Sequence, residues 1–259
     1  MKLSISNIAW AKEYDNEIYE YLGLNVFSGL EIAPTRIIET EPYEQLETAK
    51  EFADTLKNKH KLEIPSMQSI WYGKKERLFG DLEEKNELLC YTKKAIDFAS
   101  IIKCKNLVFG CPKNRIIDDK KDIAIAISFF KELGEYAVSK DTCIGIEANP
   151  SIYGTNFLNT TDEVVDFVKE VNSEGVKINL DLGTVIYNNE KFIKDISLIN
   201  HIHISEPNLE KIQKREIHLE LLKLLKENNY NKYVSIEMKN LNDINIVKET
   251  IQYIKENFK

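Results

Sequence analysis

The chain has 259 residues, of which 43% are hydrophobic and 10% aromatic, and its formal net charge is −7. This apolar content is enough for a large buried core, and the length suits one large domain or two small ones. The acidic balance argues against nucleic acid as a partner, because phosphate binding needs clustered Lys and Arg, whereas the basic residues here are spread among acids at helical spacing.

The sequence also bears on cellular location and redox state. The N-terminal stretch MKLSISNIAW has no signal-peptide hydrophobic segment, and no run of about 18 apolar residues occurs in the chain. The four cysteines form no CxxC pair, which favours reduced thiols over a disulfide framework. We therefore expect a cytoplasmic protein with no membrane partner.

β-Rich runs alternate with amphipathic runs along the whole chain. In chain order, the predicted strands span 2–10, 29–34, 61–70, 106–110, 143–150, 176–184, 199–205 and 233–240. The predicted helices, with apolar residues at spacings of three and four, span 15–24, 42–59, 82–103, 122–140, 162–174, 189–198, 218–230 and 244–258.

Eight strand–helix units in about 250 residues is the size of an α/β protein of the (β/α)8 class, the TIM barrel. We therefore predict one such barrel, as a single domain over residues 1–259. A doubly wound open sheet is the alternative, but its GxGxxG phosphate fingerprint is missing after the first strand.

Ionisable residues close four of the predicted strands, at the end of the barrel where functional side chains lie. Strands five to eight end in Glu147, Asp181, His203 and Glu237. Each closes an apolar run, and a buried charge is costly unless it is paired or bound to a metal. This mixed oxygen and nitrogen ligand set suits Mn²⁺, Mg²⁺, Co²⁺ or, less neatly, Zn²⁺. The sequence therefore predicts one divalent metal ion at the barrel mouth.

The same positions carry a resemblance to a known family. The motifs EANP (147–150), DLGT (181–184), HIHISEP (201–207) and EM (237–238) resemble those of the xylose isomerase-like barrel superfamily, which contains sugar phosphate isomerases and epimerases, ketose 3-epimerases and AP endonuclease family 2. The stretches LEIAP, QSIWYG, LVFGCPKNR, YGTNF and SIEM are similar to a bacterial isomerase/epimerase branch. The resemblance implies the same four metal ligands, with His201 one layer below His203 as a supporting or packing residue.

The resemblance also implies an activity. In the ketose epimerases, two metal-bound glutamates move a proton α to a carbonyl through a cis-enediolate, which makes Glu147 and Glu237 the expected catalytic base and acid. The protein is then a metal-dependent isomerase or epimerase of a sugar or sugar phosphate. Its oligomeric state stays open, with a homodimer as one option because barrels of this kind often pair through their helical faces. Isomerisation and epimerisation both stay open. A lyase or dehydratase acting on a keto-polyol and a non-catalytic sugar-binding barrel are the alternatives.

Candidate substrate-binding residues follow several predicted strands. Arg115, beside Lys113, follows strand four and would hold a phosphate or carboxylate, or else lie in a solvated turn. Where the ketose epimerases place a His and an Arg after strands six and seven, this chain has Thr184 and Leu209, so substrate recognition is expected to differ. The other candidates are amides, aromatic residues, a carboxylate and a helix-start histidine: Gln68, Asn149, Trp10, Trp71, Glu31 and His218.

Overall fold

A closed ring of parallel strands forms the centre of the molecule. The computed structural model describes residues 1–118, 123–193 and 195–258. Within these residues, seven strands form one parallel sheet in the order β2-β1-β7-β6-β5-β4-β3. They are β1 Lys2–Ser6, β2 Gly29–Glu31, β3 Leu107–Phe109, β4 Ile144–Glu147, β5 Val176–Asp181, β6 Ile199–Ile204 and β7 Tyr233–Ile236.

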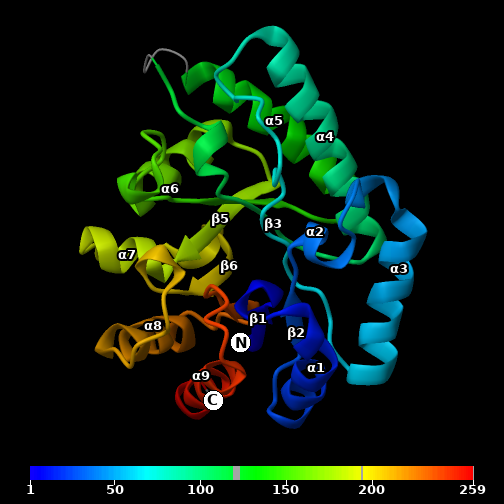
Figure 1. Ribbon diagram of the computed structural model, residues 1–259. Helices are drawn as coiled ribbons and strands as arrows, with labels where there is room; N and C mark the ends of the chain where they lie inside the picture. Colours follow the sequence, from blue (N-terminus) through cyan, green and yellow to red (C-terminus); the bar gives the residue numbers. More distant parts are fainter. Residues whose placement is uncertain (119–122, 194, 259) are drawn as a thin grey trace.

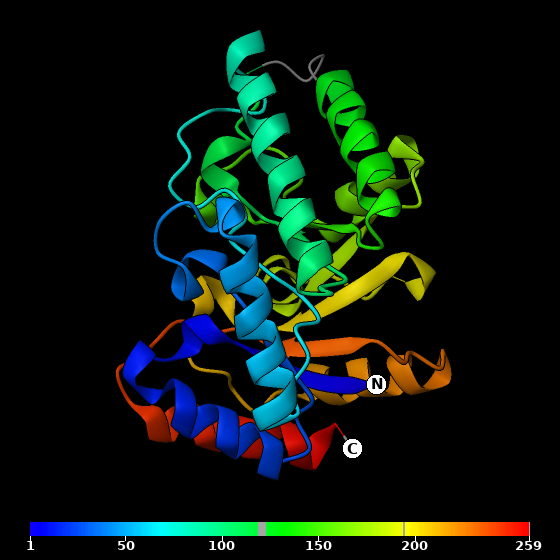
Figure 2. The same cartoon turned by 90° about the vertical axis from the view of Figure 1, so that its right-hand side faces the viewer.

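Helices cover the outside of this ring (Figure 1). In the view turned by 90°, the long helices α4 and α5 lie side by side against the sheet (Figure 2). The helices are α1 Asp15–Leu24, α2 Pro34–Ile37, α3 Leu46–Thr55, α4 Leu82–Ile101, α5 Ile123–Ser139, α6 Thr161–Val171, α7 Leu182–Asn188, α8 Glu216–Glu227 and α9 Ile244–Asn257. In the part of the chain that the structure describes, no helix is both long and apolar enough to span a membrane.

The segment 61–70, predicted as a strand, closes the barrel without being a regular strand. It makes isolated bridges to β2 and β3, at Gly29 with Glu63 and at Leu107 with Met67. The N–H of Leu30 donates to Glu63 O at 2.8 Å, and that of Val108 donates to Met67 O at 2.8 Å. Proline has no N–H to donate, and Pro65 interrupts the ladder in the middle of the segment. The predicted (β/α)8 fold is confirmed, with an irregular third strand.

The sixth crossover differs from its prediction. A helix was expected over 189–198, but α7 begins immediately after Asp181, and only a short 3-10 turn, Ile196–Leu198, falls in the expected range, whose residue 194 lies outside the described residues. The Asp181 carboxylate caps α7 by accepting from the N–H of Thr184 at 2.7 Å. Asn189 ends the helix in the left-handed conformation, with φ of 52°. The helix expected over 122–140 is α5, and residue 122 also lies outside the described residues.

A layer of small polar side chains fills the barrel below its mouth. The hydroxyls of Ser4 and Ser235 are hydrogen-bonded to each other, and Ser235 Oγ lies 2.7 Å from His201 Nε2. Asn106 Nδ2 donates to Ser66 Oγ at 3.1 Å. All five residues are at most 1% exposed. Because these buried groups hydrogen-bond to one another, they form a stable polar layer directly beneath the charged residues at the barrel mouth.

Candidate metal centre

The four predicted ligands come together at the carboxyl ends of four adjacent strands. Glu147 ends β4 and Asp181 ends β5, while His203 lies in β6 directly opposite Asp181, and Glu237 follows β7. Each offers one ligand atom, and the four atoms all lie within 4.8 Å of one another. All four residues are at most 8% exposed. The strand order thus places three carboxylates and an imidazole around one point.

His203 lies at the middle of the cluster. Its Nδ1 is 2.9 Å from Glu147 Oε1 and 3.1 Å from Glu237 Oε2, and its Nε2 is 2.9 Å from Glu31 Oε2. An amide fixes each of the two strand-end glutamates. Asn179 Nδ2 donates to Glu147 Oε1 at 2.7 Å. On the other side, Gln68 Nε2 donates to Glu237 Oε1 at 2.8 Å.

Asp181 is held by donors from α7, the helix that it caps, and from the residue that follows β6. Its Oδ2 accepts from the N–H of Thr184 at 2.7 Å and from the Thr184 hydroxyl at 2.9 Å, and its Oδ1 accepts from the Ser205 hydroxyl. Gly183 lies between these groups and donates its N–H to Ser205 Oγ at 2.7 Å. A Cβ at Gly183 would lie only 3.0 Å from Ser205 Oγ and 3.1 Å from Asp181 Oδ2, so glycine permits this close approach.

The electrostatics of the cluster reveal a shortage of positive charge. Burial, together with repulsion from Glu147, raises the pKa of Asp181 to about 6. Burial likewise raises the pKa of Glu237 to about 7, although His203 opposes the shift. Burial lowers the pKa of His203, but Glu237 and Glu31 outweigh it and hold that pKa well above its usual value.

No Lys or Arg forms an ion pair with the cluster over residues 1–118, 123–193 and 195–258. Three carboxylates therefore share one imidazole in a buried space. A divalent cation would supply the missing charge, and the donor set of carboxylate oxygens with one imidazole nitrogen fits such an ion.

The cluster opens into a cavity of about 190 Å³ at the barrel mouth. Glu147, Asp181 and Glu237 form part of its wall, and the described residues that line it include no Lys or Arg. Asn149 also lines it, and its buried Oδ1 finds no hydrogen-bond partner among the residues that the structure describes. A buried acceptor left free at a cavity wall is available to a ligand hydroxyl.

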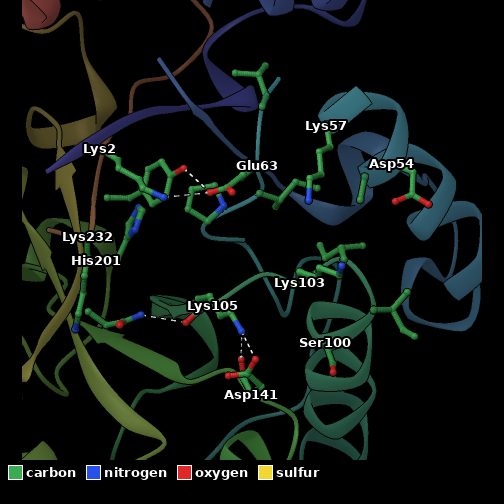
Figure 3. Close-up of a pocket in the computed structure, with 18 of the residues that line it drawn as sticks. Lys2, Asp54, Lys57, Glu63, Ser100, Lys103, Lys105, Asp141, His201 and Lys232 are labelled. Atoms are coloured by element: carbon green, nitrogen blue, oxygen red, sulfur yellow. Dashed lines mark hydrogen bonds and ion pairs between the residues drawn. The ribbon is translucent and has the colours of Figure 1, made fainter. Parts of the chain in front are cut away.

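A larger cavity, of about 720 Å³, lies at the opposite end of the barrel (Figure 3). Charged side chains near the amino ends of the strands line it, among them Lys2, Lys105 and Lys232, and His201 reaches it from the barrel interior. In barrels of this fold the reactive groups lie at the carboxyl ends of the strands. The smaller cavity is therefore the candidate active site.

Of the predicted substrate-binding residues, Gln68 and Asn149 line the candidate active-site cavity. Arg115 does not, because it is fully buried and its guanidinium donates to backbone carbonyls: Nη1 to Glu147 O at 2.9 Å and Nη2 to Leu158 O at 3.2 Å. Burial lowers its pKa to about 10. Its neighbour Lys113 is exposed and does not line the cavity. The structure thus places neither base in the cavity wall, where the sequence analysis expected them to hold a substrate phosphate or carboxylate.

Three other candidates are packing residues instead of cavity residues. Trp10 donates its indole N–H to Asp15 Oδ1 at 2.9 Å, and Trp71 donates to Thr92 Oγ1 at 2.8 Å. His218 Nδ1 lies 2.9 Å from the Tyr253 hydroxyl, between α8 and α9. The three residues are at most 2% exposed and none lines the cavity, so aromatic side chains near strand ends serve the core here.

Several residues of the site were not predicted. Asn179 and Ser205 lie two residues from Asp181 and His203, on the same strand faces, so period-2 alternation could have found them. Tyr153 lines the cavity from a turn, and its hydroxyl accepts from the N–H of Asn208 at 2.9 Å, a pairing for which the sequence has no signal.

The two positions that depart from the ketose epimerase pattern have different surroundings. Thr184 is fully buried, and its single hydroxyl proton is shared between Asp181 Oδ2 at 2.9 Å and Ala148 O at 2.8 Å, so it supports a candidate ligand. Leu209 lines the cavity and provides an apolar wall.

Similar folds are found among enzymes with different activities. A D-psicose 3-epimerase whose structure was determined in the presence of D-fructose is 17% identical, with a TM-score of 0.80 over 100% of this chain and 99% of that chain. A 3-keto-D-glucoside 4-epimerase from E. coli is 17% identical, with a TM-score of 0.76 over 99% of each chain. An AP endonuclease of family 2 from Brucella melitensis is 16% identical, with a TM-score of 0.77 over 98% of each chain. At these identities the likeness concerns the fold alone.

No curated protein matches the sequence. The family model described as "Xylose isomerase-like TIM barrel" matches residues 22–257, which confirms the resemblance seen in the strand-end motifs. The chain belongs to the xylose isomerase-like TIM barrel family.

Proposed function

We propose that the protein is a divalent-metal-dependent epimerase or isomerase of an unphosphorylated keto sugar. One observation carries the proposal. Three buried carboxylates and an imidazole, with no Lys or Arg paired to them in the described residues, open into a cavity at the carboxyl ends of the strands. Charge in such a place is stable only with a cation, and the position is that of barrel active sites.

Glu147, Asp181, His203 and Glu237 would hold the ion. When bound, a divalent ion at this point would polarise a substrate carbonyl and a neighbouring hydroxyl, which acidifies the C–H bond of the carbon that carries that hydroxyl. Carboxylate-rich sites with one imidazole suit Mn²⁺, Mg²⁺, Co²⁺ or Zn²⁺.

The two glutamates are placed for proton transfer. They come from β4 and from the end of β7, and both reach His203 Nδ1, at 2.9 and 3.1 Å, so they border the same small volume from two sides. One carboxylate removes the proton from the carbon next to the carbonyl, and the other returns a proton to the resulting enediolate. Return to the opposite face of the same carbon gives an epimer. Return to the former carbonyl carbon, with the hydroxyl proton passing from one enediolate oxygen to the other, gives an isomer.

The cavity favours a neutral substrate. Its described lining has no cationic side chain, and the nearby Arg115 is engaged by backbone carbonyls, so a phosphate group would find carboxylates and no counter-charge. The free Oδ1 of Asn149 can accept a sugar hydroxyl. At about 190 Å³, the cavity is smaller than the roughly 300–1,000 Å³ of typical ligand pockets, which suits a single sugar unit.

The first experiment is a metal analysis of protein purified without chelator. We expect about one Mn, Co, Mg or Zn per chain, and markedly less in Glu147→Gln, because that variant removes one ligand of the set. Glu63→Gln is the matched control, since Glu63 is an exposed carboxylate at the opposite end of the barrel. A wild-type protein that holds no metal even after reconstitution would refute the proposed mechanism.

The second experiment follows solvent deuterium into free ketoses and into their phosphates by NMR. We expect incorporation next to the carbonyl of a free ketose, little with the phosphates, and none in Glu237→Gln, which keeps the fold and removes a proton-transfer group. Exchange restricted to phosphorylated sugars would overturn the assignment of a neutral substrate. Loss of water from the sugar, without an epimer or isomer, would assign a dehydratase instead.

A further inference from the structure

We propose that Glu31 is a positioning residue of the metal centre, which accepts the Nε2 proton of His203 and so leaves the lone pair of Nδ1 for the metal. This inference rests on the proposed metal-dependent function. Glu31 ends β2, and β1 and β7 separate that strand from β6 in the sheet. It is outside the four-residue ligand cluster, and its direct contact with that cluster is to His203 Nε2.

The two nitrogens of the His203 ring face different surroundings. Nδ1 faces the ligand cluster, and it also lies 3.3 Å from Nδ2 of Asn179, an amide donor that matches a lone pair on Nδ1. Nε2 faces a carboxylate oxygen of Glu31 at 2.9 Å. A neutral imidazole carries one proton, and metal ligation requires the bare nitrogen, so the proton belongs on Nε2.

Two histidines explain how the Glu31 carboxylate can be buried. It is fully buried, and over the described ranges its ion pairs are with His203 and, at 3.3 Å, with His201 Nε2. Its second oxygen accepts from Gln68 Nε2 at 3.3 Å, and the same Gln68 amide holds Glu237. A buried carboxylate needs such compensation, so Glu31 favours a proton on His203 Nε2. Through Gln68, Glu31 is also connected to Glu237, a second candidate metal ligand.

A second metal ion between Glu31, His201 and His203 is the competing explanation, because their donor atoms also lie within 4.8 Å of one another. An ion there would have three protein ligands in a fully buried place, fewer than a closed metal site ordinarily provides. His203 would also have to lose both ring protons to bridge two ions. A hydrogen bond from His203 Nε2 to Glu31 needs neither a second ion nor the loss of both ring protons, which favours the positioning role.

The tautomer can be observed directly in the wild-type protein. The chain has only four histidines, so ¹⁵N-histidine labelling gives a simple spectrum in which each ring can be identified by substitution. With Zn²⁺ bound, we expect the His203 Nε2 to keep a slowly exchanging proton and its Nδ1 to shift on metal addition. A proton on Nδ1 in the metal-bound protein would overturn the proposal.

The contribution of Glu31 to metal binding is tested by the affinity for Zn²⁺, measured in competition with a chromogenic chelator. Glu31→Gln should bind Zn²⁺ about 10–100-fold more weakly than wild type. Ser235→Ala is the matched control, because Ser235 is equally buried and contacts His201 but makes no side-chain bond to His203, and its affinity should stay within about threefold of wild type.

The outcomes separate the two proposals. A wild-type protein that binds none of Zn²⁺, Mn²⁺, Co²⁺ and Mg²⁺ defeats the metal-dependent function itself. Wild-type binding with equal affinity in Glu31→Gln defeats only the positioning role, and two Zn²⁺ per chain, reduced to one in Glu31→Gln, would assign the second metal site instead.

Discussion

Replacement of Arg115 by Met tests whether this arginine builds the barrel mouth or binds substrate. The fully buried guanidinium donates to the carbonyls of Glu147 and Leu158, and Met fills most of its volume without any donor. A hydrogen bond from a charged group contributes about 1.5–3 kcal/mol net, so loss of two should lower the free energy of unfolding by about 3–6 kcal/mol. For a protein of this size, the Tm should fall by roughly 6–24 °C.

Urea unfolding and thermal melts of Arg115→Met measure this loss. Lys113→Met is the control, because Lys113 is exposed two residues away and its replacement should change stability by less than about 0.5 kcal/mol. If Arg115→Met were as stable as wild type but had a greatly raised KM, the arginine would have to reach the substrate, and its role as a support of the barrel mouth would be refuted.

Three further outcomes follow from the geometry of the cluster. Gly110→Ala places a methyl group 3.1 Å from Glu147 Oε2, so kcat/KM should fall on the order of tenfold while the melting temperature barely moves. Because the pKa of Asp181 is raised to about 6 and that of Glu237 to about 7, protons compete with the metal, and calorimetric metal affinity should weaken from pH 8 to pH 6. Removal of the metal with EDTA should lower the Tm, since an ion present at 100 times its Kd stabilises the fold by about 2.7 kcal/mol.

The barrel and its candidate ligands were predictable because both depend on local periodicity. Strand alternation brings each inward residue to a known face, and parallel order brings strand ends to the same rim, so Glu147, Asp181, His203 and Glu237 could be expected to converge. The third strand was harder to predict because its pairing depends on Pro65, which leaves bridges where the apolar pattern suggested a ladder.

The substrate-binding residues were less predictable because their roles depend on distant partners. The apolar rings of Trp10 and Trp71 suggested a sugar platform, but their indole N–H groups find Asp15 and Thr92 inside the packing. Arg115 follows a strand as a phosphate ligand would, yet its acceptors are carbonyls that lie 32 and 43 residues further along the chain. Sequence spacing carries no information about such long-range pairs. The position of a residue within a strand, by contrast, already predicts the face of the sheet on which its side chain lies.

Two buried glutamates near His203 provide a final contrast. Burial raises the pKa of Glu31, but His203 and His201 outweigh it and hold that pKa well below its usual range, so the fold stabilises its charged form. The pKa of Glu237 rises from 4.5 to about 7, mainly through burial, so its ionisation at pH 8 costs the folded state about 3 kcal/mol.

In the metal-free protein at pH 8, neutral amides at these positions should therefore have opposite effects. Glu237→Gln should raise the free energy of unfolding in urea, because it removes a charge whose burial costs more than its ion pair with His203 returns. Glu31→Gln should lower it, because two imidazoles lose their carboxylate. If the free energy of unfolding shifted in the same direction in both variants, the two glutamates would not differ as we infer, with Glu237 needing the metal and Glu31 stabilised by the protein's own histidines.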